Sequence, residues 1–384
     1  MIVGKVAVMP IKVSVIIPVF NMEQFLNECI DRVISQTLHD IEIICINDGS
    51  SDKSLDILTQ YMNADNRFVI LNQENQGPGV ARNNGIRSAK GEFIAFMDPD
   101  DWYPTSDILS NLYNTAIQNE VNICGGSLSD SLNGIVTSQF EGEWSAYTFD
   151  KAGMIRYSDY QFDYGYYRFI YKRKFLLDNR LFFPDYRRFQ DPPFFVLSMC
   201  VAKEFYAIPQ ITYCYRKGHQ SYDLPDYKLI DAIKGITDNL LISRKYNLEI
   251  LHKNTVLRLA NKNYPKLALK YLSQGNERVL FALISANSAI DIGLLQKSGF
   301  TMDDYYIIEP LKQYLAAYKS IQSTNKTVID KKYNNLLYEF KCVKNSLSYR
   351  IGRIITFLPR KIRGGYLCVR DHGLRYTLKY IFKI

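Results

Sequence analysis

VSVIIPVFNMEQFLNECIDRVISQTLHDIEIICIN, residues 13–47, is the stretch that decides the fold. It contains two apolar runs, at 13–19 and 41–47, of the continuous kind that is typical of strands buried on both faces. Between them, apolar side chains at positions 25, 30, 33 and 34 indicate a helix. A helix between two buried strands predicts parallel pairing, so we expect an α/β fold with a largely parallel sheet.

The same alternation continues to residue 98. Strands are expected at 67–71 and 92–98, with a glycine-broken helix at 77–90 between them. A polar segment follows each expected strand: Asn21, the turn 47–52, the segment 76–79 and the cluster 98–101. Ligands of open α/β sheets bind outside the carboxyl ends of the strands, so one crevice is expected to collect these groups.

Three carboxylates stand within four residues in MDPDDWY, residues 97–103. Asp98, Asp100 and Asp101 directly follow an apolar strand, and such crowding is unfavourable unless a cation or solvent relieves it. Oxygen ligands suit Mg²⁺ or Mn²⁺, and both ions share coordination with phosphates. Taken alone, the cluster fits a solvated turn with a helix cap equally well.

The order of four motifs resembles the inverting family-2 glycosyltransferases of the GT-A fold, of the type found in bacterial surface polysaccharide synthesis. The motifs are VSVIIPVFN (13–21), NDGSSDKS (47–54), NQGPGVARNNGI (75–86) and GEFIAFMDPDDWY (91–103). The resemblance covers about residues 12–104 and continues more weakly to about 221, through segments 171–196 and 202–221. It implies a mixed, mostly parallel central sheet flanked by helices.

This resemblance also predicts the domain organisation. An N-terminal extension (1–11) precedes a catalytic domain (12–225), which has a nucleotide-sugar half (12–104) and an acceptor half (105–225). A helical region (226–349) and a basic amphipathic tail (350–384) follow. The apolar N-terminus lacks a small-residue cleavage site, so we expect no signal peptide.

The donor site follows from the resemblance residue by residue. The backbone near Pro18, Val19 and Phe20 and the carboxylate of Asp48 are expected to hold the nucleotide base, most often uracil, with Asn21 beside them. Asp98 is expected to approach the ribose or diphosphate. Asp100 and Asp101 are expected to bind Mg²⁺ or Mn²⁺.

Four further residues complete the expected donor site. Gly77 and Gly79 let the backbone pass close to the donor, where a side chain would collide. Arg82 is expected beside the diphosphate or as a brace for the acids, although an Arg at such a place is usually a surface or ion-pair residue. Trp102 is expected to face the donor pocket.

Asp191 is the candidate general base, because an attacking hydroxyl must lose a proton as it reaches the anomeric carbon. In the family an acid usually precedes this position, and here it is Gln190. A second reading makes Asp191 the cap of a helix that begins at Pro192. A metal can stabilise the departing nucleoside diphosphate, so no protonated acid is needed. His219 is expected to reach the metal or the diphosphate, although a lone His in a basic loop is more often solvated.

The C-terminal third contains two features that predict binding partners, a heptad seam and a basic tail. Apolar residues at 329, 333, 336, 340, 343 and 347 form a heptad seam, which suits either an intramolecular helical hairpin or a homodimer. Residues 350–384 hold nine Lys or Arg against one Asp, which equals the whole chain's net charge of +8. This amphipathic composition predicts binding to an anionic membrane surface, whereas no nucleic-acid-binding module accompanies it.

Together these features predict a metal-dependent inverting glycosyltransferase. It would move a hexose or N-acetylhexosamine from a UDP-sugar to a saccharide or lipid-linked acceptor, for capsule, O-antigen or another surface glycan. The scattered cysteines favour a cytoplasmic enzyme, peripheral on the inner face of the cell membrane. The alternatives are a non-catalytic sugar-nucleotide-binding or partner-binding module and a nucleotidyltransferase, although the latter would usually carry a Gly-rich phosphate loop after the first strand. No G-x-G-x-x-G follows a strand, which disfavours an NAD-dependent enzyme.

Overall fold

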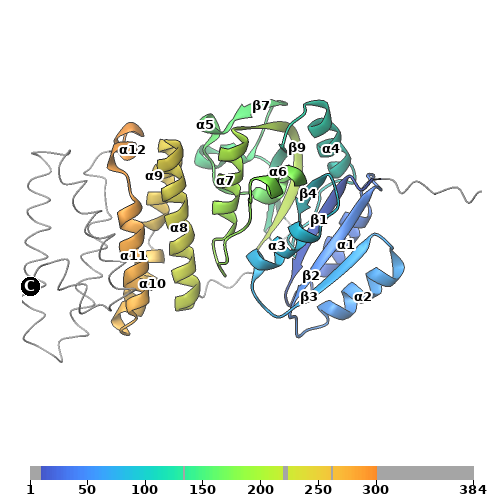
Figure 1. The fold of residues 1–384 in the computed structure, drawn as a ribbon, viewed down its shortest axis with the longest axis horizontal. Coiled ribbons are helices and arrows are strands. Elements are labelled where there is room, and N and C mark those ends of the chain that lie inside the picture. Colours follow the sequence, from blue (N-terminus) through green and yellow to red (C-terminus); the bar gives the residue numbers. More distant parts are fainter. Residues whose placement is uncertain (1–9, 133–134, 219–223, 261–262, 301–384) are drawn as a thin grey trace, which may run out of the picture. The chain divides into compact units, whose positions relative to one another are not determined.

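The computed structural model describes residues 10–132, 135–218, 224–260 and 263–300. The chain divides into two compact units between residues 222 and 223 (Figure 1). His219, the heptad seam at 329–347 and the basic tail lie outside the described residues.

The first unit is built on one sheet. In the described part of the chain this sheet has nine strands in the order β3-β2-β1-β4-β8-β5-β9-β7, with β6 paired to β5. The strands are β1 (Val13–Val19), β2 (Ile41–Asp48), β3 (Phe68–Gln73), β4 (Phe93–Phe96), β5 (Ile123–Leu132), β6 (Ile135–Thr137), β7 (Gly153–Arg156), β8 (Phe169–Lys172) and β9 (Glu204–Lys217).

Parallel pairing dominates the N-terminal side of this sheet. β1 lies parallel to both β2 and β4, and β2 lies parallel to β3. β1 and β2 are buried along their whole length, as their unbroken apolar runs predict. Beyond β4 the sheet becomes mixed, because β8 runs antiparallel to both β4 and β5.

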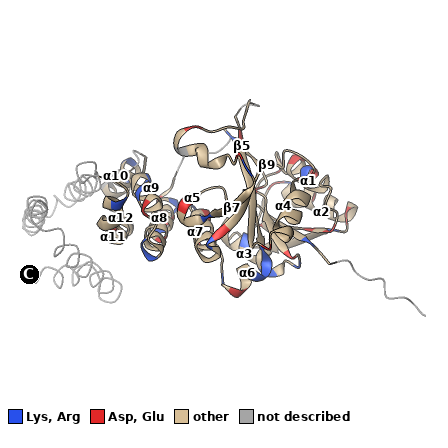
Figure 2. Cartoon of the chain, turned by 90° about the horizontal axis from the view of Figure 1, so that it is seen from above, with Lys and Arg blue, Asp and Glu red and all other residues tan. Residues whose placement is uncertain are grey.

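Helices cover both faces of the sheet (Figure 2). Helices α1 (Leu26–Ile34), α2 (Ser54–Ala64) and α4 (Ile108–Gln118) lie on one side, and α3 (Pro78–Ser88), α6 (Arg173–Asp178) and α7 (Asp191–Ala202) on the other. Gly85 permits the close packing of α3, because a Cβ built there would lie 2.5 Å from Ile16 Cγ2 of β1. The unit also contains α5 (Tyr157–Tyr160) and the 3₁₀ helices η1 (Gly142–Tyr147) and η2 (Tyr166–Arg168).

The second unit is helical where it is described. Its helices are α8 (Asp226–Tyr246), α9 (Glu249–Leu259), α10 (Asn263–Ser273), α11 (Glu277–Ala289) and α12 (Ile292–Lys297). Within the ranges described, none of the helices has both the length and the apolar composition that crossing a bilayer requires.

These two parts confirm the predicted fold class: a mixed, mostly parallel sheet flanked by helices, followed by a helical region. Individual bounds differ from the sequence-based ones. The fourth strand ends at Phe96 and not at residue 98, and the third helix begins at Pro78, after Gly77 with its φ of +92°. The exact domain boundaries remain a prediction.

Candidate functional site

The carboxyl ends of β1, β2 and β4 meet at one edge of the sheet, and the loops after β1 and β2 are tied together there. Asn21 Oδ1 accepts a hydrogen bond from the Ser51 amide at 2.8 Å, and the Asn21 amide donates to Ser50 Oγ at 3.2 Å. Asn21 adopts a left-handed conformation (φ +53°) to make this turn. The predicted segments 18–21 and 47–52 are therefore neighbours, with Phe20 exposed beside them.

Asp48, the last residue of β2, orders the segment that leads into α3. Its Oδ1 accepts hydrogen bonds from Gln73 Nε2 (2.7 Å) and the Gln76 amide (2.8 Å), and its Oδ2 accepts one from the Gly77 amide (2.8 Å). An ionised carboxylate has about four acceptor positions, so three such bonds leave capacity for one more donor. Asp48 thus fixes the turn at Gly77 and retains one acceptor position, which the predicted hydrogen bond to the nucleotide base requires.

The acid cluster begins at Asp98, two residues after β4. Asp98 Oδ1 accepts hydrogen bonds from Arg82 Nη2 at 2.5 Å and from the Tyr166 hydroxyl at 3.0 Å. Arg82 therefore braces the acids, which is one of the two roles expected from the sequence.

Asp101 is the most enclosed of the three acids, with 1% of its surface exposed. Its Oδ1 accepts the Arg216 amide (2.7 Å), and its Oδ2 accepts the Tyr213 hydroxyl (2.7 Å). Burial, followed by the charges of Asp100 and Asp98, raises the pKa of the Asp101 carboxyl well above its usual value. The three acids therefore repel one another in a place that water reaches poorly.

Arg82 is a buried cation whose hydrogen bonds are incomplete. Only 5% of its surface is exposed, and its guanidinium lies 5.2 Å from the ring centre of Tyr166 and 5.4 Å from that of Phe183. Its Nε and Nη1 have no acceptor among the described residues. Two buried donors without partners, next to a carboxylate cluster, suit an anionic ligand.

Asp191 reaches the same place from a different segment. It is the first residue of α7, so the helix begins one residue earlier than the capping reading required. Burial raises the pKa of the Asp191 carboxyl, and the nearby Arg82 guanidinium opposes that shift while Asp98 adds to it. The structure thus places the candidate base within electrostatic reach of the Arg82–Asp98 pair.

Gly77 and Gly79 make room for the loop that precedes α7. A Cβ on Gly77 would lie 2.8 Å from Arg187 Cδ, and one on Gly79 would lie 2.7 Å from the Pro184 carbonyl and 3.3 Å from Gln190 Cγ. Arg187 Nη2 also donates to the Asn75 carbonyl at 2.9 Å. The packing of the chain itself therefore favours residues without a side chain at these two positions.

Trp102 pairs its backbone with Cys214 of β9, and its ring lies 4.6 Å below the Arg216 guanidinium. Its orientation toward a donor remains a prediction. Sequence reasoning missed Tyr166, Tyr213 and Arg216, which hold Asp98 and Asp101 in place. No local signal pairs Tyr213 with an acid 112 positions earlier.

The chemistry of this acid cluster fits a divalent cation. In the described ranges no three Asp, Glu, His or Cys side chains converge in a ready-made metal site. Mg²⁺, however, is usually held by only one or two carboxylates together with substrate phosphates. A cation held by these acids would relieve the repulsion that raises the pKa of Asp101.

Residues 14–177 match the family model described as "Glycosyl transferase family 2". The chain is 34% identical over 221 residues to the uncharacterized glycosyltransferase EpsJ of Bacillus subtilis, an alignment that covers 56% of this chain and 64% of that protein. It is 42% identical over 127 residues to a poly(ribitol-phosphate) beta-glucosyltransferase of Bacillus spizizenii, covering 32% of this chain and 20% of that one. The chain thus spans less than two thirds of these relatives.

The crystal structure of S. aureus TarS 1–349 in complex with UDP-GlcNAc superposes with a TM-score of 0.64 at 17% identity, covering 82% of this chain and 91% of that one. At this identity the likeness concerns the fold, which is the GT-A fold expected from the sequence.

Proposed function

We propose, from the match of residues 14–177 to the glycosyl transferase family 2 model, that the chain is a metal-dependent inverting glycosyltransferase. It moves a hexose or N-acetylhexosamine from a UDP-sugar to a saccharide or lipid-linked acceptor of a surface glycan. The relatives named as a poly(ribitol-phosphate) glucosyltransferase and as TarS with UDP-GlcNAc support this substrate class.

One observation carries the proposal: Arg82 and Asp98 form an ion pair at the edge of the sheet, 2.5 Å between Arg82 Nη2 and Asp98 Oδ1, and both charges act on Asp191 at the start of α7. Asp191 is a carboxylate that can accept a proton, and Arg82 is a cation that can bind the diphosphate. Sugar transfer requires both kinds of group. Asp191 accepts the proton of the attacking hydroxyl, and a pKa raised by burial makes this carboxylate a better base.

Donor binding is assigned to the loops that follow β1 and β2, together with Arg82. Pro18, Val19, Phe20 and Asn21 hold the base together with the remaining acceptor position of Asp48. Arg82 Nε and Nη1 donate to the diphosphate, which supplies the acceptors that these two buried groups lack.

We assign the metal to Asp100, with Asp101 and His219 as further ligands. When bound, Mg²⁺ or Mn²⁺ neutralises the charge that develops on the departing UDP. Tyr213 and Arg216 keep Asp101 oriented through their two hydrogen bonds.

The test is release of UDP from a panel of UDP-sugars in Mn²⁺ by Asp191→Asn. Loss of a positioned general base is expected to slow turnover about 10³-fold, while UDP affinity stays within about twofold of wild type. Asp178→Asn, at an exposed ion pair on α6, is the matched control and should behave as wild type. An Asp191→Asn enzyme that releases UDP at the wild-type rate would remove Asp191 from the mechanism.

A non-catalytic binding module is the second candidate, because Gln190 stands where related enzymes usually carry an acid. Gln190 is buried, and a Cβ built on Gly79 would lie 3.3 Å from its Cγ. UDP binding without any donor turnover by wild type would favour this candidate.

The tail is proposed to attach the enzyme to the inner face of the cell membrane, on the basis of its nine basic residues and apolar composition. Flotation with anionic liposomes should be lost in a chain that ends at Leu347, and equal flotation of both forms would refute this role. The seam at 329–347 is proposed as a homodimer contact, which sedimentation of the full chain and of a chain that ends at Val328 would test.

A further inference from the structure

The loop between α6 and α7 leads directly into the candidate base. It runs from residue 179 to residue 190, and Asp191 is the first residue of α7. We call residues 179–190 the α6–α7 loop. Three sets of contacts attach this loop to α3 and to the segment before α3, and they fix where α7 begins.

The first attachment is a pair of hydrogen bonds from the middle of α3. Asn83 Nδ2 donates to the Phe183 carbonyl at 2.8 Å, and Asn83 Oδ1 accepts the Phe183 amide at 2.9 Å. The Phe183 ring also stacks on Phe194 of α7, with 3.9 Å between ring centres. One buried side-chain amide thus satisfies both backbone groups of Phe183, which anchors the loop to α3.

The second attachment is the close approach of the loop to the first turn of α3. A Cβ built on Gly79 would lie 2.7 Å from the Pro184 carbonyl and 3.3 Å from Gln190 Cγ, so two separate parts of the loop meet the same glycine. A Cβ on Gly77 would lie 2.8 Å from Arg187 Cδ. The loop therefore packs on the turn that leads into α3.

Arg187 provides the third attachment, to the segment that Asp48 orders. Its Nη2 donates to the Asn75 carbonyl at 2.9 Å, and its Nη1 donates to Asn75 Oδ1. Asn75 also lies close to the turn after β2, because a Cβ on Gly49 would be 3.0 Å from the Asn75 amide nitrogen. Two residues farther on, the Gly77 amide donates to Asp48. The guanidinium thus joins the α6–α7 loop to the segment beside the proposed base-binding carboxylate.

The backbone at the end of the loop shows that these contacts hold it in an unfavourable conformation. Phe189 has a φ of +63°, in the left-handed region that bulky residues rarely adopt. Such a conformation persists only where the surrounding contacts impose it. Phe189 lies between Arg187 and Gln190, which are both in contact with the α3 side, and it is two residues before Asp191.

We propose that Arg187 is a positioning residue that couples the donor-binding segment 75–77 to Asp191. The inference rests on the proposed function, which places the nucleotide base at Asp48 and makes Asp191 the general base. A base bound to Asp48 holds this carboxylate and, through it, residues 75–77. Arg187 passes that order to the α6–α7 loop and to the start of α7. A general base must lie within hydrogen-bond reach of the proton, so a small displacement of α7 slows transfer.

The first measurement is hydrogen–deuterium exchange of the full chain with and without UDP. In the wild type, UDP is expected to slow the exchange of backbone amides in the α6–α7 loop as well as in residues 75–77. In Arg187→Ala, UDP should still protect residues 75–77 and no longer protect the loop. UDP affinity should stay within about twofold of wild type, because Arg187 acts through the loop and not on the nucleotide.

The second measurement is UDP release from a UDP-sugar that the wild type uses. Arg187→Ala is expected to lower kcat about 30-fold while KM for the donor stays within about twofold, since a displaced base affects the reaction step and not donor binding. Arg187→Lys keeps one donor for Asn75, so its kcat should lie between those of Arg187→Ala and wild type.

Arg173→Ala is the matched control. Arg173 is half-buried like Arg187, and its Nε donates to a backbone carbonyl at the same distance, that of Gly91 at 2.9 Å. Gly91 lies just before β4, at the end of the strand opposite to the acid cluster. This variant should keep both the wild-type kcat and the protection of the loop by UDP.

Three outcomes would overturn the positioning role: a UDP-bound wild type whose loop is not protected, an Arg187→Ala chain that keeps both protection and kcat, or one whose UDP affinity falls as much as its kcat/KM. Loop protection that needs Arg187, in a chain that releases no UDP from any UDP-sugar, would keep the coupling and refute the proposed transfer. A wild type that binds no UDP would refute both.

Discussion

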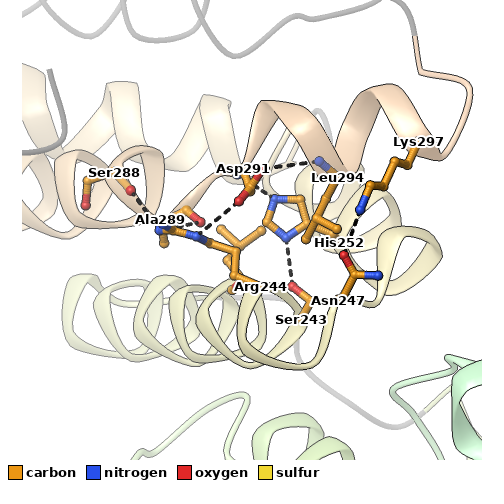
Figure 3. Close-up of polar contacts among 10 residues, drawn as sticks. Ser243, Arg244, Asn247, His252, Ser288, Ala289, Asp291, Leu294 and Lys297 are labelled. Atoms are coloured by element: carbon orange, nitrogen blue, oxygen red, sulfur yellow. Dashed lines mark hydrogen bonds and ion pairs between the residues drawn. The ribbon is translucent and has the colours of Figure 1, made fainter. Parts of the chain in front are cut away.

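Two buried polar clusters, one in each unit of the chain, differ in how completely their hydrogen bonds are satisfied. In the helical unit, His252 is fully buried and both of its ring nitrogens are bonded, Nδ1 to Ser243 Oγ at 2.7 Å and Nε2 to the Asp291 amide at 2.8 Å (Figure 3). In the first unit, Arg82 is almost as buried, yet Nε and Nη1 lack acceptors among the described residues.

A structural role accounts for every hydrogen bond of the His252 side chain. The Asp291 amide can only donate, so Nε2 must accept, and Nδ1 carries the proton that goes to Ser243. Ser243 in turn donates to the Leu240 carbonyl at 2.9 Å. The imidazole thereby links α8, α9 and the start of α12, and neither ring nitrogen is left to bind a ligand.

A structural role alone does not account for the Arg82 cluster, because two charged donors lie in the interior without an acceptor in the part of the chain that the structure describes. A buried unsatisfied donor costs about 1–3 kcal/mol, more when it is charged. Unlike the His252 cluster, the Arg82 cluster therefore retains two charged donors that an anionic ligand can bind.

The largest effect is expected for His252→Leu. It removes the partners of the Asp291 amide and of Ser243, so the free energy of unfolding of the helical unit should fall by about 3 kcal/mol. Lys297→Ala is the control; its bond to Asn247 is exposed, and its loss should change stability by less than about 0.5 kcal/mol. Urea unfolding monitored by circular dichroism measures both, and UDP affinity should not change in either variant. A His252→Leu chain of wild-type stability would contradict the structural role.

Arg82→Lys is expected to have the next largest effect, on binding and not on folding. Lysine keeps a positive charge beside Asp98 but lacks the fork of donors that Nε and Nη1 provide. UDP affinity should fall about 30-fold, or about 2 kcal/mol, with little change in the melting temperature. The matched variant is Arg67→Lys, at a partly buried ion pair with Asp65, which should bind UDP normally. If Arg82→Lys melts far below wild type yet binds UDP unchanged, the two clusters do not differ as described.

Acidification is expected to give the smallest of the three effects, through His252 in the helical unit. Burial lowers the pKa of His252 to about 4, with Asp291 opposing the shift and Arg244 adding to it. The unfolded chain takes up this proton below about pH 6.5 and the folded chain does not, so stability falls as the pH drops from about 6.5 toward 4. At pH 5.5 the loss should be about 1.4 kcal/mol. The wild-type curve minus the His252→Leu curve isolates this histidine, and a flat difference would contradict the assigned pKa.

The donor half of the first unit could be predicted in detail because its signals are local. Each strand is one apolar run, and each polar loop follows its strand directly, so Asn21, Asp48 and Asp98 were expected at one edge from sequence order alone. The partners of Asp98 and Asp101 were not predictable, because Tyr166 and Tyr213 are distant in sequence and reach the acids only through the mixed part of the sheet.

The side-chain hydrogen bonds of the helical unit could not be predicted from the sequence for the same reason. His252 showed no recognisable spacing to other polar residues, and its partner amide at Asp291 belongs to the start of another helix. The contacts among the rings between residues 144 and 213 could not be predicted from the sequence, since tertiary contacts and not periodicity order those rings.

The most direct measurement of the central claim is calorimetric titration of UDP into the wild type and into Asp100→Asn, each with and without Mn²⁺. If the acids at the end of β4 hold a cation against a diphosphate, Mn²⁺ should strengthen UDP binding to wild type by at least about tenfold, and Asp100→Asn should lose that gain. Equal UDP affinity of the wild type with and without Mn²⁺ would contradict the account.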